Sequence, residues 1–301
     1  MSSLQNLFDR FGLIGTSGST CDDAESAMNA GRYYRAVAIL RPLARSGDAR
    51  AQMRLGGLLM IGKGIRRDTK TGIELIRKSA EAGFAEGEFA LGTLYWLGED
   101  VEQDGNEALR WLSRAASKGN VEAQLVAGDI LLKGKDVPQN PTEAAKWLRM
   151  AAEQGDAQAQ NNLGTMYDRG NGVEKNQAEA VRWFRAAAEQ GHVIAQYNLG
   201  SMYEHGDGVS ADGAKAVHWY HAAGNQGYYK ACVALAQMYE EGRQGVPVDN
   251  AFAFIWYLAA FREAEDEDDK QFADDACDRV LAKATPEQMK GLAEEYRKEA
   301  Y

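Results

Sequence analysis

Four histidines between residues 192 and 221 are the most obvious candidates for chemistry in this sequence. His218 and His221 are three positions apart, a spacing that places two imidazoles on one face of a helix and suits a shared metal ion. No cysteine or third ligand is placed beside them by spacing. Their positions match arginine and lysine positions elsewhere in the chain. The sequence therefore predicts solvent-exposed histidines, and neither a metal site nor a cofactor.

The stretch DRGNGV, residues 168–173, carries Gly170 and Gly172 between two expected helices, where a phosphate-binding loop could lie. A Walker loop needs Lys and Ser or Thr after its last glycine, and a dinucleotide fold needs a preceding strand. Neither feature is present. The turn also recurs as GKGI, GEDV, GKDV, GDGV and GRQGV. A left-handed turn between helices is predicted instead, because glycine tolerates positive φ.

These turns belong to an internal repeat of 36 residues. Apolar residues recur three and four positions apart in each unit, which predicts two amphipathic helices per repeat. One glycine marks the period: Gly47, Gly83, Gly119, Gly155, Gly191 and Gly227. A large apolar residue, predicted to lie in the core between helices, recurs as Leu75, Trp111, Trp147, Trp183, Trp219 and Trp256.

The second helix of each repeat has its own start signal. A side chain able to accept a hydrogen bond from free helical N–H groups recurs as Asp68, Asp104, Asn140, Asn176, Asp212 and Asp249. Glu107 and Glu179 each lie three residues after such a position, which is the spacing of a reciprocal capping box.

The pattern A-x-x-x-L-G-x-x-Y-x-x-G-x-G-V followed by A-x-x-W-x-x-x-A-A-x-x-G resembles the Sel-one-like repeat (SLR) family, relatives of the tetratricopeptide repeats. We expect an all-α, right-handed α/α solenoid of helix-turn-helix repeats with a 36-residue period, capped at both ends. The expected parts are an amphipathic segment (1–20), a degenerate helix pair (21–46), six repeats (47–262) and capping helices (263–301). Residues 263–269 are acid-rich, as in a solvated loop or a segment that binds a basic partner.

Composition narrows the classes of function. The 301 residues carry 44 acidic and 34 basic side chains, a net charge of -10, which disfavours binding to nucleic acids and anionic membranes. No apolar run is long enough to span a membrane, and Asp9 and Arg10 argue against a signal peptide. Three distant cysteines form no disulfide pattern, which indicates a reducing, cytoplasmic compartment. A monomer is favoured.

Solenoids usually bind partners on the concave surface formed by their first helices. On these first helices, some residues are expected to face away from the apolar residues that pack against neighbouring helices. They include Gln158, Asn162, Thr165, Arg169, Asn198, Ser201, His205 and Gln237. Amide side chains can donate and accept hydrogen bonds with an extended peptide. Asn162 and Asn198 fit either this role or bracing of neighbouring helices. Trp96 does not share the repeat position of the other five tryptophans, and it fits either an interaction anchor or local packing.

We therefore expect a non-enzymatic scaffold or adaptor that binds a peptide or protein segment on its concave face. The resemblance implies a role in bacterial signalling or complex assembly. One alternative is an enzyme, since some cysteine-rich SLR relatives are described as binding or hydrolysing β-lactams, but this chain lacks their paired cysteines and an S-x-x-K motif. The other alternative is an architectural bridge between two proteins.

Overall fold

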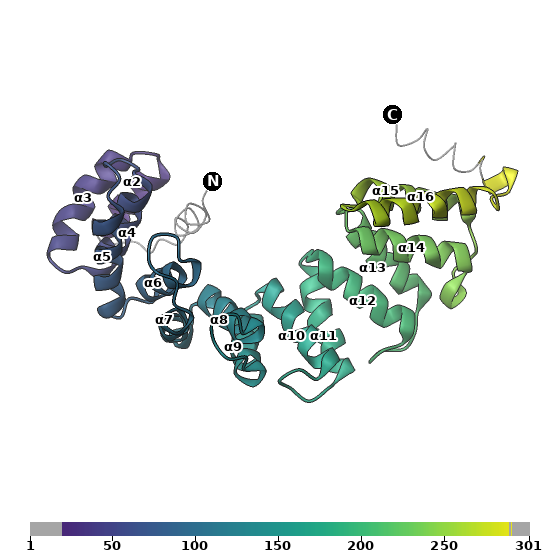
Figure 1. Ribbon diagram of the computed structural model, residues 1–301, viewed down its shortest axis with the longest axis horizontal. Coiled ribbons are helices and arrows are strands. Elements are labelled where there is room, and N and C mark those ends of the chain that lie inside the picture. The colour runs from purple at the N-terminus through teal and green to yellow at the C-terminus, as the bar shows by residue number, and fades with distance from the viewer. Residues whose placement is uncertain (1–19, 289, 291–301) are drawn as a thin grey trace. The chain divides into compact units, whose positions relative to one another are not determined.

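The computed structural model describes residues 20–288 and residue 290, and every regular element in that part of the chain is helical (Figure 1). The chain divides into two compact units, residues 1–151 and residues 152–301. The expected amphipathic segment 1–20 lies outside the described residues except for Thr20, as does the C-terminal cap beyond residue 290. None of the described helices combines the length and apolarity that a membrane crossing requires.

The helices follow one another as pairs that recur about every 36 residues. Those that begin in the N-terminal unit are α2 (Thr20–Asn29), α3 (Tyr33–Arg45), α4 (Ala49–Ile61), α5 (Thr69–Glu81), α6 (Ala85–Leu97), α7 (Gly105–Ser117), α8 (Val121–Lys133) and α9 (Pro141–Glu153). Those of the C-terminal unit are α10 (Ala157–Arg169), α11 (Gln177–Glu189), α12 (Val193–His205), α13 (Gly213–Gly224), α14 (Tyr229–Glu241), the 3-10 turn η1 (Arg243–Gly245), α15 (Asn250–Glu263) and α16 (Glu267–Leu281). Consecutive helices pack against one another within the series α2 to α8 and within the series α10 to α16. This arrangement confirms the predicted α/α repeat.

All six predicted N-caps of the second helices are formed. The Asp104 carboxylate, for example, accepts a hydrogen bond from the N–H of Glu107 at 3.0 Å. The capping box is nevertheless only half formed. The backbone N–H of Asp104 donates to the carbonyl of Tyr95 at 3.1 Å, and that of Asn176 to the carbonyl of Tyr167 at 2.9 Å. The first helix of each repeat therefore takes the donor that the Glu side chain was expected to bind.

Glycine has two separate roles in a repeat. Gly170 ends α10 in the left-handed region, with φ 70°, and its N–H donates to the carbonyl of Met166, as predicted. Gly164 lies inside α10, where a Cβ atom would come within 2.7 Å of the Phe184 ring. The first glycine is required by backbone conformation and the second by the close approach of α11.

The tryptophan position is less buried than predicted. Trp111, Trp183 and Trp256 are buried, whereas Trp147 and Trp219 are only half-buried. The following residue is the one enclosed in every repeat, with at most 3% exposed: Ile76, Leu112, Leu148, Phe184, Tyr220 and Tyr257. In the first five repeats, that residue packs against the glycine inside the first helix. The neighbouring indole has a charged partner instead: in the fourth repeat, the Arg182 guanidinium lies 4.2 Å from the centre of the Trp183 ring.

The acid-rich stretch is helical over its second part, which corrects the expectation of a loop. Asp266 is the N-cap of α16 and accepts a hydrogen bond from the N–H of Asp269 at 2.7 Å. Acidic residues in the first turn of a helix are stabilised by its dipole. A further helical start at Thr285 is closed by reciprocal hydrogen bonds with Gln288, at 2.9 and 3.2 Å.

Candidate functional site

The candidate residues on the C-terminal unit lie on three first helices, α10, α12 and α14. The side chains of Gln158 and Arg169 on α10 and of His205 on α12 are exposed. The others are partly exposed: Asn162, Thr165, Asn198, Ser201 and Gln237. Every candidate on this unit is thus reachable from solvent to some degree.

A chain of amide hydrogen bonds joins part of this set. The Gln158 amide donates to the Asn162 side-chain oxygen at 2.8 Å, and its own oxygen lies 3.2 Å from Nε2 of His192. The Asn198 amide donates to the side-chain oxygen of Asn161 at 3.1 Å. Asn161 is buried, so Asn198 connects α12 to the interior of α10. This contact favours the bracing interpretation of Asn198.

His192 was not predicted as part of this surface. It is the N-cap of α12, and its Nδ1 atom accepts a hydrogen bond from the N–H of Ala195 at 3.2 Å. Partial burial lowers the pKa of His192, so its neutral form is favoured near pH 7. Since Nδ1 is the acceptor, Nε2 carries the proton and donates to Gln158.

The hydroxyl groups on this surface are partly engaged by their own helices. Thr165 donates to the carbonyl of Asn161 at 3.0 Å. Nδ1 of His205 lies 2.9 Å from the carbonyl of Ser201, a contact that favours the proton on Nδ1. The exposed Nε2 of His205 is then an acceptor for a partner.

Two predicted residues are not brought into this set. Gln237 lies on α14, and no hydrogen bond within the described residues joins it to Gln158, Asn162 or Asn198. Trp96 belongs to the N-terminal unit, where it is half-buried and packs against the cluster around Phe89. This contact favours the local-packing interpretation of Trp96.

Comparison with known proteins identifies the repeat. The family model described as Sel1 repeat matches residues 49–84, 85–120, 121–156, 157–192, 193–228 and 230–263. The chain belongs to the Sel1 repeat family. Repeat solenoids of this kind commonly serve as protein-interaction scaffolds.

Two solved structures are similar to this Sel1 repeat chain over most of its length. A Sel1 repeat protein from Oxalobacter formigenes is 28% identical, with a TM-score of 0.68, over 83% of this chain and 99% of that one. The antigen c5321 of uropathogenic Escherichia coli, which displays an SLR fold, is 26% identical, with a TM-score of 0.62, over 100% of this chain and 72% of that one. A search of curated proteins found no match.

The histidine pair of the fifth Sel1 repeat has aromatic partners. The His218 ring packs edge-on against Trp219, with centroids 4.9 Å apart, and the His221 ring against Trp256, at 5.1 Å. The Asn225 amide lies 3.1 Å from Nδ1 of His221. Among the described residues, no group of three His, Cys, Asp or Glu side chains is arranged to hold a metal ion.

Sequence reasoning missed a buried glutamine that recurs in this Sel1 repeat protein. Gln52, Gln124, Gln160 and Gln196 each donate to a carbonyl near the end of the preceding second helix, at 2.9–3.3 Å. Each of these carbonyls also accepts a hydrogen bond from the N–H of the glycine three residues later, so the glutamine amide is its second donor at the helix C-terminus. Each of these glutamines follows an alanine, and they are spaced by 36 or 72 residues along the chain. The recurrence of glutamine at one position of the repeat was the signal that the sequence offered.

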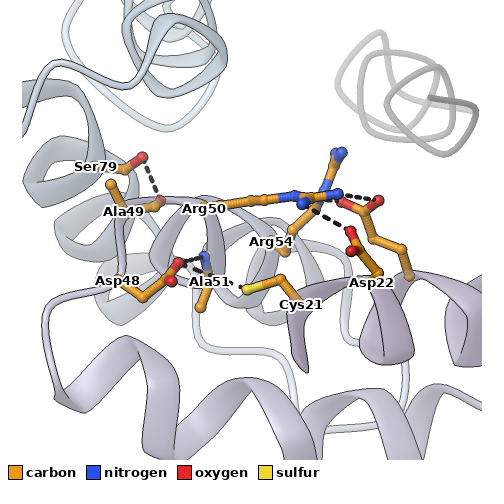
Figure 2. A network of polar contacts seen from close by, with 9 residues as sticks. Cys21, Asp22, Asp48, Ala49, Arg50, Ala51, Arg54 and Ser79 are labelled. Carbon is orange, nitrogen blue, oxygen red and sulfur yellow. Dashed lines mark hydrogen bonds and ion pairs between the residues drawn. The ribbon is translucent and has the colours of Figure 1, made fainter. Parts of the chain in front are cut away.

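The N-terminal unit contains an ion cluster that links α2 to α4. Figure 2 shows Arg50 and Arg54 of α4 extended towards the acidic side chains of α2. Arg50 binds both carboxylate oxygens of Glu25, at 2.6 and 3.0 Å, and reaches Asp22 at 2.8 Å. Arg54 binds Glu25 at 2.8 Å. The mutual pairing of these largely buried groups makes the cluster a structural one.

Proposed function

We propose that this Sel1 repeat protein is a non-enzymatic scaffold that binds a peptide or protein segment along α10, α12 and α14. The observation that carries the proposal is the exposed amide and cationic surface of α10, made of Gln158, Asn162 and Arg169. Amides offer a peptide backbone both a donor and an acceptor, and Arg169 offers a charged contact to an acidic side chain or a chain terminus.

The hydrogen bonds divide the candidate residues by role. Gln158, Asn162, Arg169 and His205 are proposed to contact the partner directly, because Asn162 is partly exposed and the other three are exposed. Asn198 is proposed to act indirectly, because it holds α12 to α10 through Asn161. Thr165, Ser201 and Gln237 are secondary contacts in this proposal.

The test is a comparison of partner capture by matched variants of the full chain. Asn162→Ala/Arg169→Glu should lose captured proteins while helical content and the melting temperature stay close to those of the wild type. The control, Lys175→Glu/Gln177→Ala, makes the same change of charge and a similar change of size in the same repeat and should retain capture. Proteins retained by wild type and control but lost from the test variant would be identified by mass spectrometry.

Three outcomes would contradict this assignment. Equal capture by both variants would remove the surface of α10 from the binding site. Capture that tolerates every substitution on the first helices would favour a bridge that uses other surfaces. Turnover of a chromogenic β-lactam that persists through extensive purification would favour an enzyme.

We further propose that the protein acts in the cytoplasm of a bacterium, in signalling or complex assembly. Burial raises the pKa of each thiol, Cys21, Cys232 and Cys277, to about 11, so the described cysteines are unreactive, free thiols. Such cysteines are compatible with a reducing compartment. Fractionation of cells that carry a tagged chain would test the location.

A further inference from the structure

A cavity of about 480 Å³ lies in the N-terminal unit where α3, α4 and α5 meet. Its apolar lining is formed by Leu55, Leu59, Ile65 and Leu75, and its exposed cations are Arg41, Arg45 and Lys78. We call it the Leu75 pocket. A volume of this size accommodates a large side chain of a bound peptide or a small molecule.

The pocket lies where the repeat has lost its indole. Leu75 occupies the frame position that holds tryptophan in the five later repeats. In the next repeat, Trp111 is buried in a cluster with Leu91, Tyr95 and Val101. Those three residues correspond, 36 positions on, to Leu55, Leu59 and Ile65 of the pocket. The cavity is therefore the space that an indole and a phenol ring fill in the following repeat.

Within the described residues, two cations at the pocket lack the partners that their counterparts have one repeat later. Arg77 of α5 donates to the Tyr95 hydroxyl at 3.0 Å, and Arg114 of α7 pairs with Glu88 at 2.8 Å. The counterparts at the pocket are Arg41 and Lys78, where Leu59 stands in place of the tyrosine and Gln52, the residue usual at its repeat position, in place of the glutamate. That glutamine is already engaged, since it donates to the carbonyl of Ala44.

Arg41, Arg45 and Lys78 form no ion pair or side-chain hydrogen bond within the described residues. The surrounding segment is basic: residues 20–78 contain twelve Lys and Arg residues against six Asp and Glu, a net charge of +6 in a chain of net charge -10. An anionic ligand is therefore favoured at this place.

The lining determines which anion fits. Single-stranded nucleic acids are usually held by aromatic side chains on which bases stack, whereas the apolar residues here are aliphatic. An aliphatic cavity beside cations suits a large apolar side chain flanked by carboxylates. The chain's own residues 1–19 match this poorly, because their only charged side chains, Asp9 and Arg10, cancel.

We propose that the Leu75 pocket binds an acidic segment of a partner protein, taking one large apolar side chain into the cavity while Arg41, Arg45 and Lys78 pair with flanking carboxylates. This site is independent of the surface proposed on α10, α12 and α14, and uses different chemistry.

The direct test is fluorescence anisotropy with the full chain and a labelled peptide, DEEWEDE, at low ionic strength. Leu75→Trp restores the residue of the other repeats and occupies part of the cavity, so it should weaken binding about tenfold or more without lowering the melting temperature. Arg41→Glu/Arg45→Glu should abolish binding without altering the core. The peptides DEEAEDE and NQQWQNQ should each bind at least about tenfold more weakly than DEEWEDE.

Arg35→Glu/Arg66→Glu is the matched control, because it makes the same change in net charge at exposed residues outside the pocket lining. Its affinity for DEEWEDE should stay within about threefold of the wild-type value, the residual effect being long-range attraction. A selective loss in the pocket variants supports the proposal even if Leu75→Trp proves unstable.

The proposal is overturned if Leu75→Trp binds the peptide as the wild type does, or if the control double variant loses as much affinity as Arg41→Glu/Arg45→Glu. Tighter binding by Phe8→Ser/Phe11→Ser would show that the chain's own N-terminal segment occupies the pocket. Sedimentation that reveals self-association abolished by Leu75→Trp would make a second copy the occupant. Binding of oligo-dT that also disappears in Leu75→Trp would indicate a nucleic acid.

Discussion

The two units use one repeat frame but fill its polar positions differently. Residues 1–151 carry 20 basic and 19 acidic side chains, whereas residues 152–301 carry 14 and 25. At one repeat position, buried Glu88 of the N-terminal unit binds Arg114 and Lys118. A glutamine at this position donates to a helix end in the other repeats of that unit, Gln52 and Gln124, and in two repeats of the C-terminal unit, Gln160 and Gln196. The frame therefore fixes where a buried polar group must lie, and leaves open whether it is an ion or an amide.

The enclosed residue after the tryptophan should be equally important in both units. Leu112→Ala and Phe184→Ala should each lower the free energy of unfolding by about 3–4 kcal/mol, because both side chains are buried against a first helix. Urea unfolding followed by circular dichroism would measure this. Trp219→Ala is the control and should cost less, since its side chain is half-buried. An equal cost for Trp219→Ala would place the core at the indole instead.

The ion cluster of the N-terminal unit should be more sensitive than an amide of the C-terminal unit. Glu25→Ala should cost about 3 kcal/mol, because it removes the carboxylate from Arg54, which is only 8% exposed. Gln160→Ala should cost about 1 kcal/mol, the loss of one hydrogen bond. Chemical denaturation of both variants would compare them. Equal losses would show that charge and amide are interchangeable here.

One ion cluster of the C-terminal unit should make its stability depend on pH. The Arg279 guanidinium, with Lys283 and the Tyr257 hydroxyl, lowers the pKa of Glu240 to about 2. The carboxylate is the form favoured by folding, so this stabilisation is complete above about pH 4.5, the ordinary pKa, and is lost as the pH falls towards 2. Because Arg279 is 44% exposed, solvent screening reduces the contribution to about 1–2 kcal/mol.

Glu240→Gln tests this assignment, because the amide is close in size to the carboxylate but does not titrate. The difference in unfolding free energy between wild type and variant should be largest at pH 6 and should shrink by about 1–2 kcal/mol on going to pH 2.5. A difference that does not change with pH would remove Glu240 from the acid sensitivity of this unit.

The smallest expected effect concerns the contact between first helices. Asn198→Ala should lower the free energy of unfolding by about 1 kcal/mol, because the Asn161 side chain loses a donor. Asn162→Ala should cost less, since its partner Gln158 is exposed to water, whereas the Asn161 partner of Asn198 is buried. Thermal melting of both variants would rank them. The reverse order would assign bracing to Asn162 and partner contact to Asn198.

Local signals in the sequence predicted the repeat well. Asp104 as an N-cap and Gly170 as a left-handed helix end depend on a few neighbouring residues, so spacing alone identified them. The half-formed capping box and the burial of Phe184 depend on where the other helix of the pair lies. Those two features were missed or mistaken because spacing along one helix contains no information on its neighbour.

The sequence predicted which helices carry the candidate residues but not the contacts that these residues make. The period placed Gln158, Asn162 and Asn198 on first helices, and the structure keeps them partly or fully exposed. It could not reveal that Asn198 is bound to Asn161, or that His192 bonds to Gln158, because those pairs lie 37 and 34 residues apart. Their meeting depends on how successive repeats stack.

By itself, the sequence determined the all-helical class, the 36-residue period and the start and end of most helices, because these follow from hydrogen bonding and backbone preferences within a few residues. Tertiary structure alone decided which polar groups are paired across repeats and which are not. Leu75 illustrates the division. The alignment of repeats shows a leucine in place of tryptophan, but only the packing of α3, α4 and α5 leaves that space open beside cations that have no ion-pair partner among the described residues.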